Sequence, residues 1–144
     1  MDTQKGKIKD KKKPSTAQLI TKEEGFSEEL QLSFLQFVFP QRLNVGDCTI
    51  KENSVLTYYS DGSYSYSATT MSTDTNDEWG YKLILRDINQ GEIYKLPPYA
   101  DHSYFHMDDS NNWYSWTDNR TNIPDPRGAA IFNNIHFANY ECSC

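Results

Sequence analysis

The stretch LTYYSDGSYSYSATT, residues 56–70, decides the fold class. In its second half Tyr64, Tyr66 and Ala68 alternate strictly with serines. A period of two is typical of a β-strand that is buried on one face. Asp61 and Gly62 interrupt the pattern, and glycine readily adopts the positive φ of a tight reversal. The stretch therefore predicts a β-hairpin that turns at these two residues.

The residues that follow predict a second hairpin. From residue 79 to residue 85 every other side chain is apolar or aromatic, and Lys82 is expected on the opposite, solvent-exposed face. Residues 89–91 (Asn-Gln-Gly) favour a turn. Residues 92–96 then run back until the Pro97-Pro98 pair removes two backbone donors and ends the strand.

Short runs of the same kind continue along the chain. They lie at residues 35–39, 48–52, 103–107, 112–117 and 135–142. Helix is expected only in short pieces, near residues 27–33, where Ser27 precedes two glutamates as a capping residue would, and near residues 128–133. The sequence predicts an all-β chain, a single antiparallel sandwich or small barrel with one or two short helices.

Charge is unevenly distributed along the 144 residues. Residues 1–13 carry six basic and two acidic residues (+4), and residues 14–144 carry eight basic and eighteen acidic ones (−10), which together give −6. We predict a Lys-rich flexible leader over residues 1–25 and a single β domain over residues 26–144. Because an acidic body repels phosphate backbones, we expect no nucleic-acid partner.

The sequence carries no pattern for a membrane span. Its apolar runs, such as residues 37–39, are far shorter than the roughly 20 residues that cross a bilayer. The basic leader is followed by polar residues rather than by the apolar core of a signal peptide. A cytoplasmic location and export by a non-classical route are both left open.

Several short motifs follow one another in a fixed order. They are Gly46-Asp47-Cys48-Thr49, Tyr59-Ser60-Asp61-Gly62, Asp77-Glu78-Trp79, Arg86-Asp87, Ile131-Phe132 and the terminal Cys144. In this order they resemble an uncharacterised bacterial family of domains of unknown function. The resemblance covers residues 34–144, implies a small all-β domain, and supplies no catalytic residues.

The three cysteines predict one covalent link. Cys48 lies near the first hairpin, and Cys142 and Cys144 close the chain. Residues two apart in an extended segment face the same way, so the last two compete for one partner. We predict a Cys48–Cys144 disulfide that leaves one thiol, with pairing to Cys142 and three reduced thiols as the open alternatives.

Metal and catalytic motifs find little support. His102 and His106 lie among aspartates in a connection and a short strand, where solvated side chains need no ion. The acidic loop at residues 74–78 lacks the spacing of a calcium loop. Motifs for a nucleophile elbow, a phosphate loop or a metalloprotease helix do not occur in the sequence. We expect no metal and no cofactor, and the sequence favours binding over catalysis while leaving enzyme activity open.

The predicted ligand site is a segment rich in aromatic and polar residues. Its members are Asn112, Trp113, Tyr114, Trp116 and Asp118. In a strand, Trp113 points to one face and Tyr114 and Trp116 to the other, so a ring meets solvent unless both faces are covered. An exposed ring bordered by an amide and a carboxylate suits a sugar or a protein. Rings that fill a core poor in aliphatic residues are the alternative.

Two functional hypotheses follow from these features. The first is a non-enzymatic β-rich binding module that recognises a glycan or a protein partner through surface aromatics. The second is a secreted or injected effector, or a toxin-associated cargo, that uses the Lys-rich N-terminus as a sorting signal.

Overall fold

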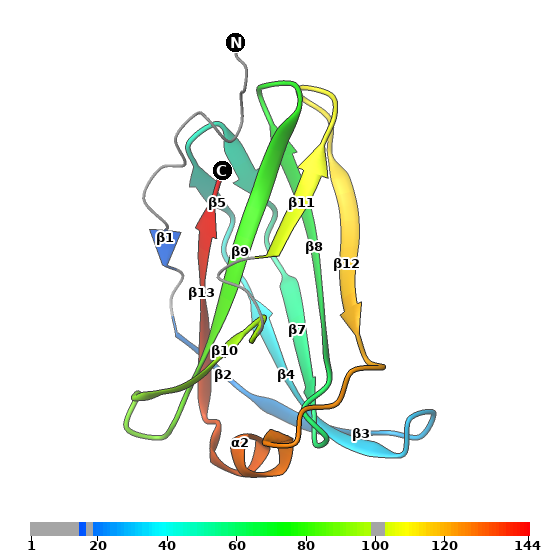
Figure 1. Ribbon diagram of the computed structural model, residues 1–144. Coiled ribbons are helices and arrows are strands. Elements are labelled where there is room, and N and C mark those ends of the chain that lie inside the picture. The colour runs from blue at the N-terminus through cyan, green and yellow to red at the C-terminus, as the bar shows by residue number, and fades with distance from the viewer. Residues whose placement is uncertain (1–14, 17–18, 99–102) are drawn as a thin grey trace.

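The computed structural model describes residues 15–16, 19–98 and 103–144. Two antiparallel β-sheets pack face to face as a sandwich, and a short helix lies at one end (Figure 1). The predicted antiparallel all-β sandwich is confirmed, and the sheets do not close into a barrel.

Sheet A is built around its longest strand, β9. Its strands are β1 (Ser15–Thr16), β2 (Ile20–Thr21), β9 (Asp77–Arg86), β10 (Glu92–Leu96), β11 (Ser103–Met107) and β13 (Phe137–Ser143). One edge of β9 pairs with β13, and the other pairs with β10 and β11. The two shortest strands, β1 and β2, pair with β13.

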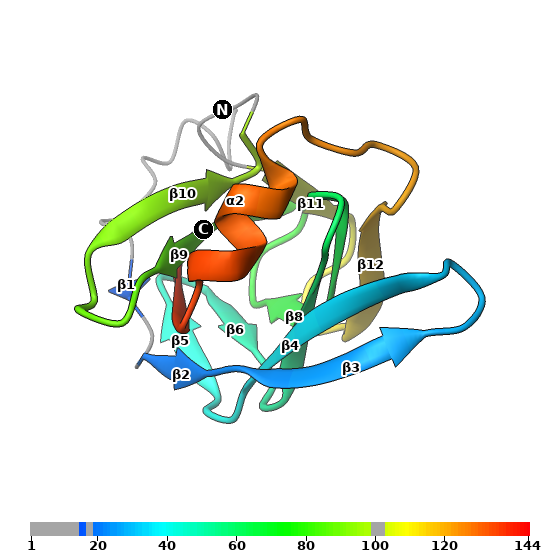
Figure 2. The same ribbon diagram turned by 90° about the horizontal axis from the view of Figure 1, so that it is seen from below.

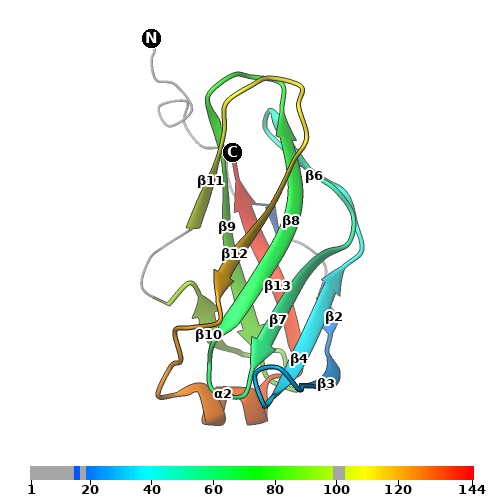
Figure 3. The same ribbon diagram turned by 90° about the vertical axis from the view of Figure 1, so that its right-hand side faces the viewer.

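Sheet B is built around β8. Its strands are β3 (Glu23–Ser27), β4 (Leu32–Phe39), β5 (Leu43–Val45), β6 (Cys48–Ile50), β7 (Ser54–Tyr59), β8 (Tyr64–Ser72) and β12 (Tyr114–Arg120). Along one edge β8 pairs with β7 and then with β6, and along the other edge it pairs with β12 (Figure 3). Strand β12 therefore forms an edge of sheet B beside β11 of sheet A.

Both predicted hairpins are confirmed. In the β7–β8 turn, Gly62 has a φ of 88°, and Asp61 accepts hydrogen bonds from the backbone and the hydroxyl of Ser63. In the β9–β10 turn the positive φ of 68° falls on Gln90, while Asp87 accepts two backbone N–H groups. Aspartate side chains thus fix both turns, as their sequence context predicts.

Aromatic rings fill the space between the sheets. The largest fully buried side chains are Trp79, Tyr58, Tyr66, Tyr81, Tyr140, Phe37 and Phe39. Phe39 of sheet B stacks on Tyr140 of sheet A with ring centroids 4.5 Å apart. Each ring buries more area than an aliphatic side chain, so the core reaches the necessary size with few leucines and valines.

The predicted helix near residues 27–33 is wrong, because this segment is the turn between β3 and β4. The Ser27 hydroxyl does accept the Leu30 N–H at 3.1 Å, which is the bond that a helix cap makes. A left-handed Gln31, with a φ of 56°, then reverses the chain. The same local serine bond serves turns and helices, so it does not distinguish them.

The predicted second helix is confirmed as α2 (Gly128–Asn134), which lies across one end of the sandwich (Figure 2). The segment before it touches the β7–β8 turn, where the Asp125 N–H donates to the Asp61 carbonyl at 2.9 Å. Here a Cβ on Gly128 would lie 2.4 Å from the Gly62 nitrogen. The two glycines therefore permit a direct contact between backbones.

Most of the predicted leader, residues 1–14 and 17–18, lies outside the described residues. Residues 20–21 and 23–27 form β2 and β3, which pair with β13 and β4. Within the part of the chain that the structure describes, no helix has the length and apolar character that a bilayer crossing requires.

Candidate functional site

Strand β12 divides the predicted ligand residues between two environments. Tyr114 and Trp116 point inward and pack against the core. Trp113 takes the other face, where the Lys51 Nζ and the Arg42 Cζ lie 4.7 and 5.5 Å from its ring centroid. Asn112 is exposed just before it.

Trp116 closes the side of the sandwich between β11 and β12. Its ring stacks on Phe105 with centroids 5.2 Å apart, and its Nε1 donates to Thr70 Oγ1 at 3.0 Å. The ring of Tyr114 also contacts Phe105, at a centroid distance of 6.0 Å and an interplanar angle of 58°. These two rings are thus engaged in joining the sheets.

Asp118 is also engaged in the structure. Its carboxylate accepts hydrogen bonds from the Tyr81 hydroxyl, from Ser103 Oγ at 3.0 Å and from Arg120 Nε at 2.7 Å. Burial, with the neighbouring Tyr64 and Asp118, raises the pKa of Tyr81 far above its usual value. The predicted ligand residues therefore separate into an inward group and an outward pair, Asn112 and Trp113.

A groove of about 330 Å³ lies on the outer face of sheet B. We call it the hydroxyl groove. It is lined by Glu52, Asn53, Ser54, Val55, Ser67, Ala68, Thr69, Ser115, Trp116 and Thr117. Cross-strand pairs Ser67–Thr117 and Thr69–Ser115 are each hydrogen-bonded at 2.9 Å between β8 and β12.

Charged groups connect the hydroxyl groove to Trp113. Arg42, which lies over the indole ring, forms an ion pair with the groove residue Glu52 at 3.2 Å. Backbone hydrogen bonding and the Arg42 guanidinium lower the pKa of Glu52, so its carboxylate is ionised at neutral pH. Arg42 thus links the groove carboxylate, Glu52, to an indole ring over which a second cation, Lys51, also lies.

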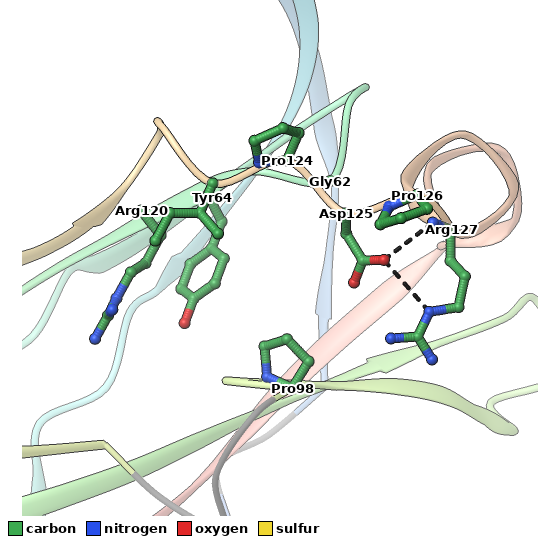
Figure 4. Close-up of a pocket in the computed structure, with 9 residues that line it drawn as sticks. Gly62, Tyr64, Pro98, Arg120, Pro124, Asp125, Pro126 and Arg127 are labelled. Atoms are coloured by element: carbon green, nitrogen blue, oxygen red, sulfur yellow. Dashed lines mark hydrogen bonds and ion pairs between the residues drawn. The ribbon is translucent and has the colours of Figure 1, made fainter.

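A second hollow, of about 270 Å³, opens near α2 (Figure 4). We call it the basal pocket. It is lined by Gly62, Tyr64, Pro98, Arg120, Ile123, Pro124, Asp125, Pro126 and Arg127. Figure 4 shows Arg120 and Tyr64 on one side, Asp125 and Arg127 on the other, and Pro98 facing them.

Asp125 organises one wall of the basal pocket. It accepts hydrogen bonds from the Tyr94 hydroxyl and from the backbone N–H and Nε of Arg127. Although burial opposes the shift, these bonds hold the pKa of Asp125 below its usual value. Burial and the bond to Asp125 raise the pKa of Tyr94 to about 12.

The predicted disulfide joins Cys48 of β6 to Cys144 after β13, with 5.9 Å between Cα atoms. Cys142 is a buried free cysteine, and burial raises the pKa of its thiol well above the usual value. The fully buried Asp77 lies beside the bridge, with Oδ2 3.3 Å from Cys144 Sγ. Because the sulfur atoms of the bridge are bonded to each other, they do not offer thiolate ligands to a metal.

Two clusters of side chains involve the segments that the sequence analysis weighed as metal sites, the acidic loop at residues 74–78 and the segment of His102 and His106. One carboxylate oxygen each from Asp47, Asp74 and Asp77 lies within 4.8 Å of the others. Asp77 already accepts the Ser72 hydroxyl at 2.7 Å and the Glu78 N–H at 2.9 Å, so we assign no ligand there. In the second cluster the Nε2 of His106 lies 3.0 Å from Asp108, and His102 lies outside the described residues.

The fold and these two hollows define a small β-sandwich protein with open sites on one sheet face and at one end. Residues 55–144 match the family of unknown function DUF6294, so the chain belongs to that family. The match confirms the resemblance and covers the chain from β7 to β13. Comparison with curated proteins and with solved structures finds no match.

Buried phenols make the stability of the protein sensitive to alkali. Burial raises the pKa values of Tyr58, Tyr66, Tyr81 and Tyr140 above the value of about 10 in the unfolded chain. As the pH rises, the unfolded chain therefore loses these protons at a lower pH than the folded protein does. The stabilisation that the protonated phenols give is fully present below about pH 9 and decreases as the pH rises further. The four phenols should lower the free energy of unfolding by about 1.5 kcal/mol between pH 8 and pH 10.

Urea unfolding at the two pH values measures this loss, and Tyr58→Phe is the matched control. The Tyr58 hydroxyl has no hydrogen-bond partner among the described residues, so the variant should be at least as stable at pH 8 and lose less at pH 10. Equal stability of the natural protein at both pH values would contradict the expectation.

Proposed function

We propose that the protein is a non-enzymatic binding module that holds a glycan on the outer face of sheet B. The observation that carries the proposal is the position of Trp113, which is partly exposed and is connected to the hydroxyl groove through Arg42: Arg42 and Lys51 lie over the indole ring, and Arg42 also pairs with the groove residue Glu52. Catalysis has no comparable support in either site.

The chemistry of this surface matches the chemistry of a sugar ring. A pyranose presents C–H groups on one face, which pack on an indole, and hydroxyls around its rim, which donate and accept hydrogen bonds. The groove offers hydroxyls, which both donate and accept hydrogen bonds, together with the Asn53 amide and the Glu52 carboxylate. Lys51 and Arg42, which lie over the indole, add hydrogen-bond donors.

The shape of the groove favours a glycan over a folded protein partner. Protein interfaces place their binding energy in a buried apolar or aromatic centre. The hydroxyl groove is lined mainly by small polar side chains, with a volume in the range of small-molecule sites. A chain of sugars that lies along Ser67, Thr69 and Trp113 satisfies these polar groups better than an apolar patch does.

Replacing Trp113 with alanine should weaken glycan binding about 30-fold, which corresponds to about 2 kcal/mol. The indole supplies the stacking surface and its side chain is outside the core, so the free energy of unfolding should change little. A glycan array of neutral and acidic oligosaccharides identifies the ligand, and calorimetry with the strongest binder measures the loss.

Tyr104→Ala is the matched control for this variant. It removes a ring that is 53 % exposed on the outer face of sheet A, where Tyr104 covers Gly80. Glycan binding should be unchanged in this variant. Equal loss in both variants, or the absence of any array signal for the natural protein, would overturn the proposal, and the latter result would favour a protein partner.

A further inference from the structure

Three buried side chains from different strands converge at the end of the sandwich where the chain terminates (Figure 1). Cys48 begins β6, Asp77 begins β9, and Cys144 follows β13. One atom of each, the two sulfurs and a carboxylate oxygen, lies within 4.8 Å of the others. The two sulfurs form the disulfide, so this cluster can hold an ion through them only after the bridge is reduced.

The distances from Asp77 to the two sulfurs are those of a tetrahedral zinc site. Its Oδ2 lies 3.3 Å from Cys144 Sγ and 3.7 Å from Cys48 Sγ. Zinc binds sulfur at about 2.3 Å and a carboxylate oxygen at about 2.1 Å, so tetrahedral angles place two such ligands about 3.5 Å apart. Two thiolates on one zinc lie about 3.8 Å apart, which is close to the contact distance of sulfurs that are no longer bonded. The carboxylate therefore already occupies the position of a ligand.

Hydrogen bonds hold Asp77 in this orientation. Its Oδ2 accepts the Ser72 hydroxyl at 2.7 Å, and its Oδ1 accepts the Glu78 N–H at 2.9 Å. In the bridged protein these bonds satisfy the carboxylate, and no thiolate accompanies it. A carboxylate has about four lone-pair positions, more than these two bonds use, and zinc-binding carboxylates are commonly oriented by such bonds. Ser72 and Glu78 can therefore remain partners of Asp77 when the reduced sulfurs complete the ligand set.

Two further carboxylates connect this cluster to the surface. Asp47 is exposed and Asp74 is half-buried, and one oxygen of each lies within 4.8 Å of an oxygen of the buried Asp77. A cation that arrives from solvent can therefore exchange water for carboxylate oxygens before it reaches the sulfurs. The fourth position of a tetrahedral zinc is filled by one of these two carboxylates or by water.

We propose that the reduced protein binds one zinc ion through the Cys48 and Cys144 thiolates and the Asp77 carboxylate. A dithiol first breaks the bond between the two sulfurs. It supplies two electrons and two protons, which yield two cysteine thiols, and it becomes a disulfide itself. Zinc then displaces both thiol protons, which pass to solvent. Two thiolates with one carboxylate favour zinc over calcium and magnesium, which prefer oxygen ligands alone.

The zinc ion takes the place of the covalent bridge. Like the disulfide, it joins β6 of sheet B to the end of β13 in sheet A, and it adds β9 through Asp77. The protein therefore keeps a link between its sheets under oxidising and under reducing conditions, and oxidation releases the metal. The lining of the hydroxyl groove includes none of the three ligands, so this inference does not depend on glycan binding.

Titration of the full chain with Co²⁺ tests the proposal, because Co²⁺ accepts the ligands of zinc and reports them by its absorption. A phosphine reduces the bridge without adding a thiol, since it takes up oxygen from water and leaves the two protons on the sulfurs. One equivalent of Co²⁺ should then produce a thiolate-to-cobalt charge-transfer band and the visible bands of tetrahedral cobalt. One equivalent of zinc should remove both. The oxidised protein, and the reduced chain unfolded in concentrated urea, should bind at least tenfold more weakly.

Variants and the Tm locate the ion. Asp77→Asn, checked for folding in its oxidised form, should weaken cobalt binding at least tenfold, and replacement of both Cys48 and Cys144 with alanine should abolish the charge-transfer band. Cys142→Ala, which removes the free thiol and keeps the other two, should bind as the natural protein does. Zinc should raise the Tm of the reduced, metal-free protein by about 5 °C or more and leave that of the oxidised protein unchanged. Absence of the cobalt bands, equal binding by the oxidised or unfolded chain, full binding by the Asp77 or double variant, or loss of binding in Cys142→Ala would overturn the proposal.

Discussion

Replacing both Cys48 and Cys144 with alanine should lower the free energy of unfolding by roughly 4–5 kcal/mol, which corresponds to a drop in Tm of about 15 °C. The bridge spans 96 residues of sequence and ties β6 of sheet B to the end of β13 in sheet A. Its loss gives the unfolded chain a large conformational entropy that the bridge removes. The double variant avoids leaving one thiol beside the buried Asp77.

Cys142→Ala is the control for this experiment, because it removes a buried thiol and keeps the bridge. It should cost about 1 kcal/mol. Thermal unfolding with and without reductant gives an independent reading: reductant should lower the Tm of the natural protein and leave that of the double variant unchanged. If reductant does not change the Tm of the natural protein, the prediction is contradicted.

Replacing Gly128 with alanine should lower the free energy of unfolding by about 3 kcal/mol. The new Cβ would lie 2.4 Å from the carbonyl carbon of Asp61 and from the nitrogen of Gly62. Both atoms belong to the backbone, so no change of rotamer relieves the clash, and the loop must separate from the β7–β8 turn. The same movement should displace Asp125 and Arg127 in the wall of the basal pocket.

Gly91→Ala supplies the comparison at an open position. Its Cβ would come no closer than 3.4 Å to the Asp87 carboxylate, which is an ordinary contact. This variant should change stability by less than about 0.5 kcal/mol. Urea unfolding of the two variants side by side decides the point, and equal stability would show that the backbone contact at Gly128 tolerates a side chain.

Local patterns predicted most of the fold. The alternation from Tyr64 to Ala68 and the turn at Asp61 depend on neighbouring residues, so the first hairpin follows from sequence alone. The helix expected near residues 27–33 failed because Ser27 makes the same bond in a turn as in a helix. Local patterns do not encode the long-range pairing of strands. They therefore left open whether the chain forms a sandwich or a barrel.

The candidate sites were harder to predict for the same reason. Strand alternation correctly separated Trp113 from Trp116, but the burial of Trp116 depends on Phe105, which arrives from the other sheet. Lys51 and Arg42 meet Trp113 only through the pairing of β6 with β8 and β5. In the sequence, the basal pocket corresponds only to three prolines and two arginines near turns. These residues form a pocket because the chain segments at Gly62 and Gly128 come into contact, which the sequence pattern does not predict.

The central claim is that a glycan binds at Trp113, and the indole N–H resonances of the protein test it most directly. The chain has three tryptophans, and the structure places Trp79 in the core, Trp116 between the sheets and Trp113 on the outer face. During an NMR titration with the glycan that binds most tightly on the array, the Trp113 indole resonance should move and saturate, while the Trp79 resonance stays in place. A titration that shifts Trp79 or Trp116 and leaves Trp113 unmoved would contradict the claim.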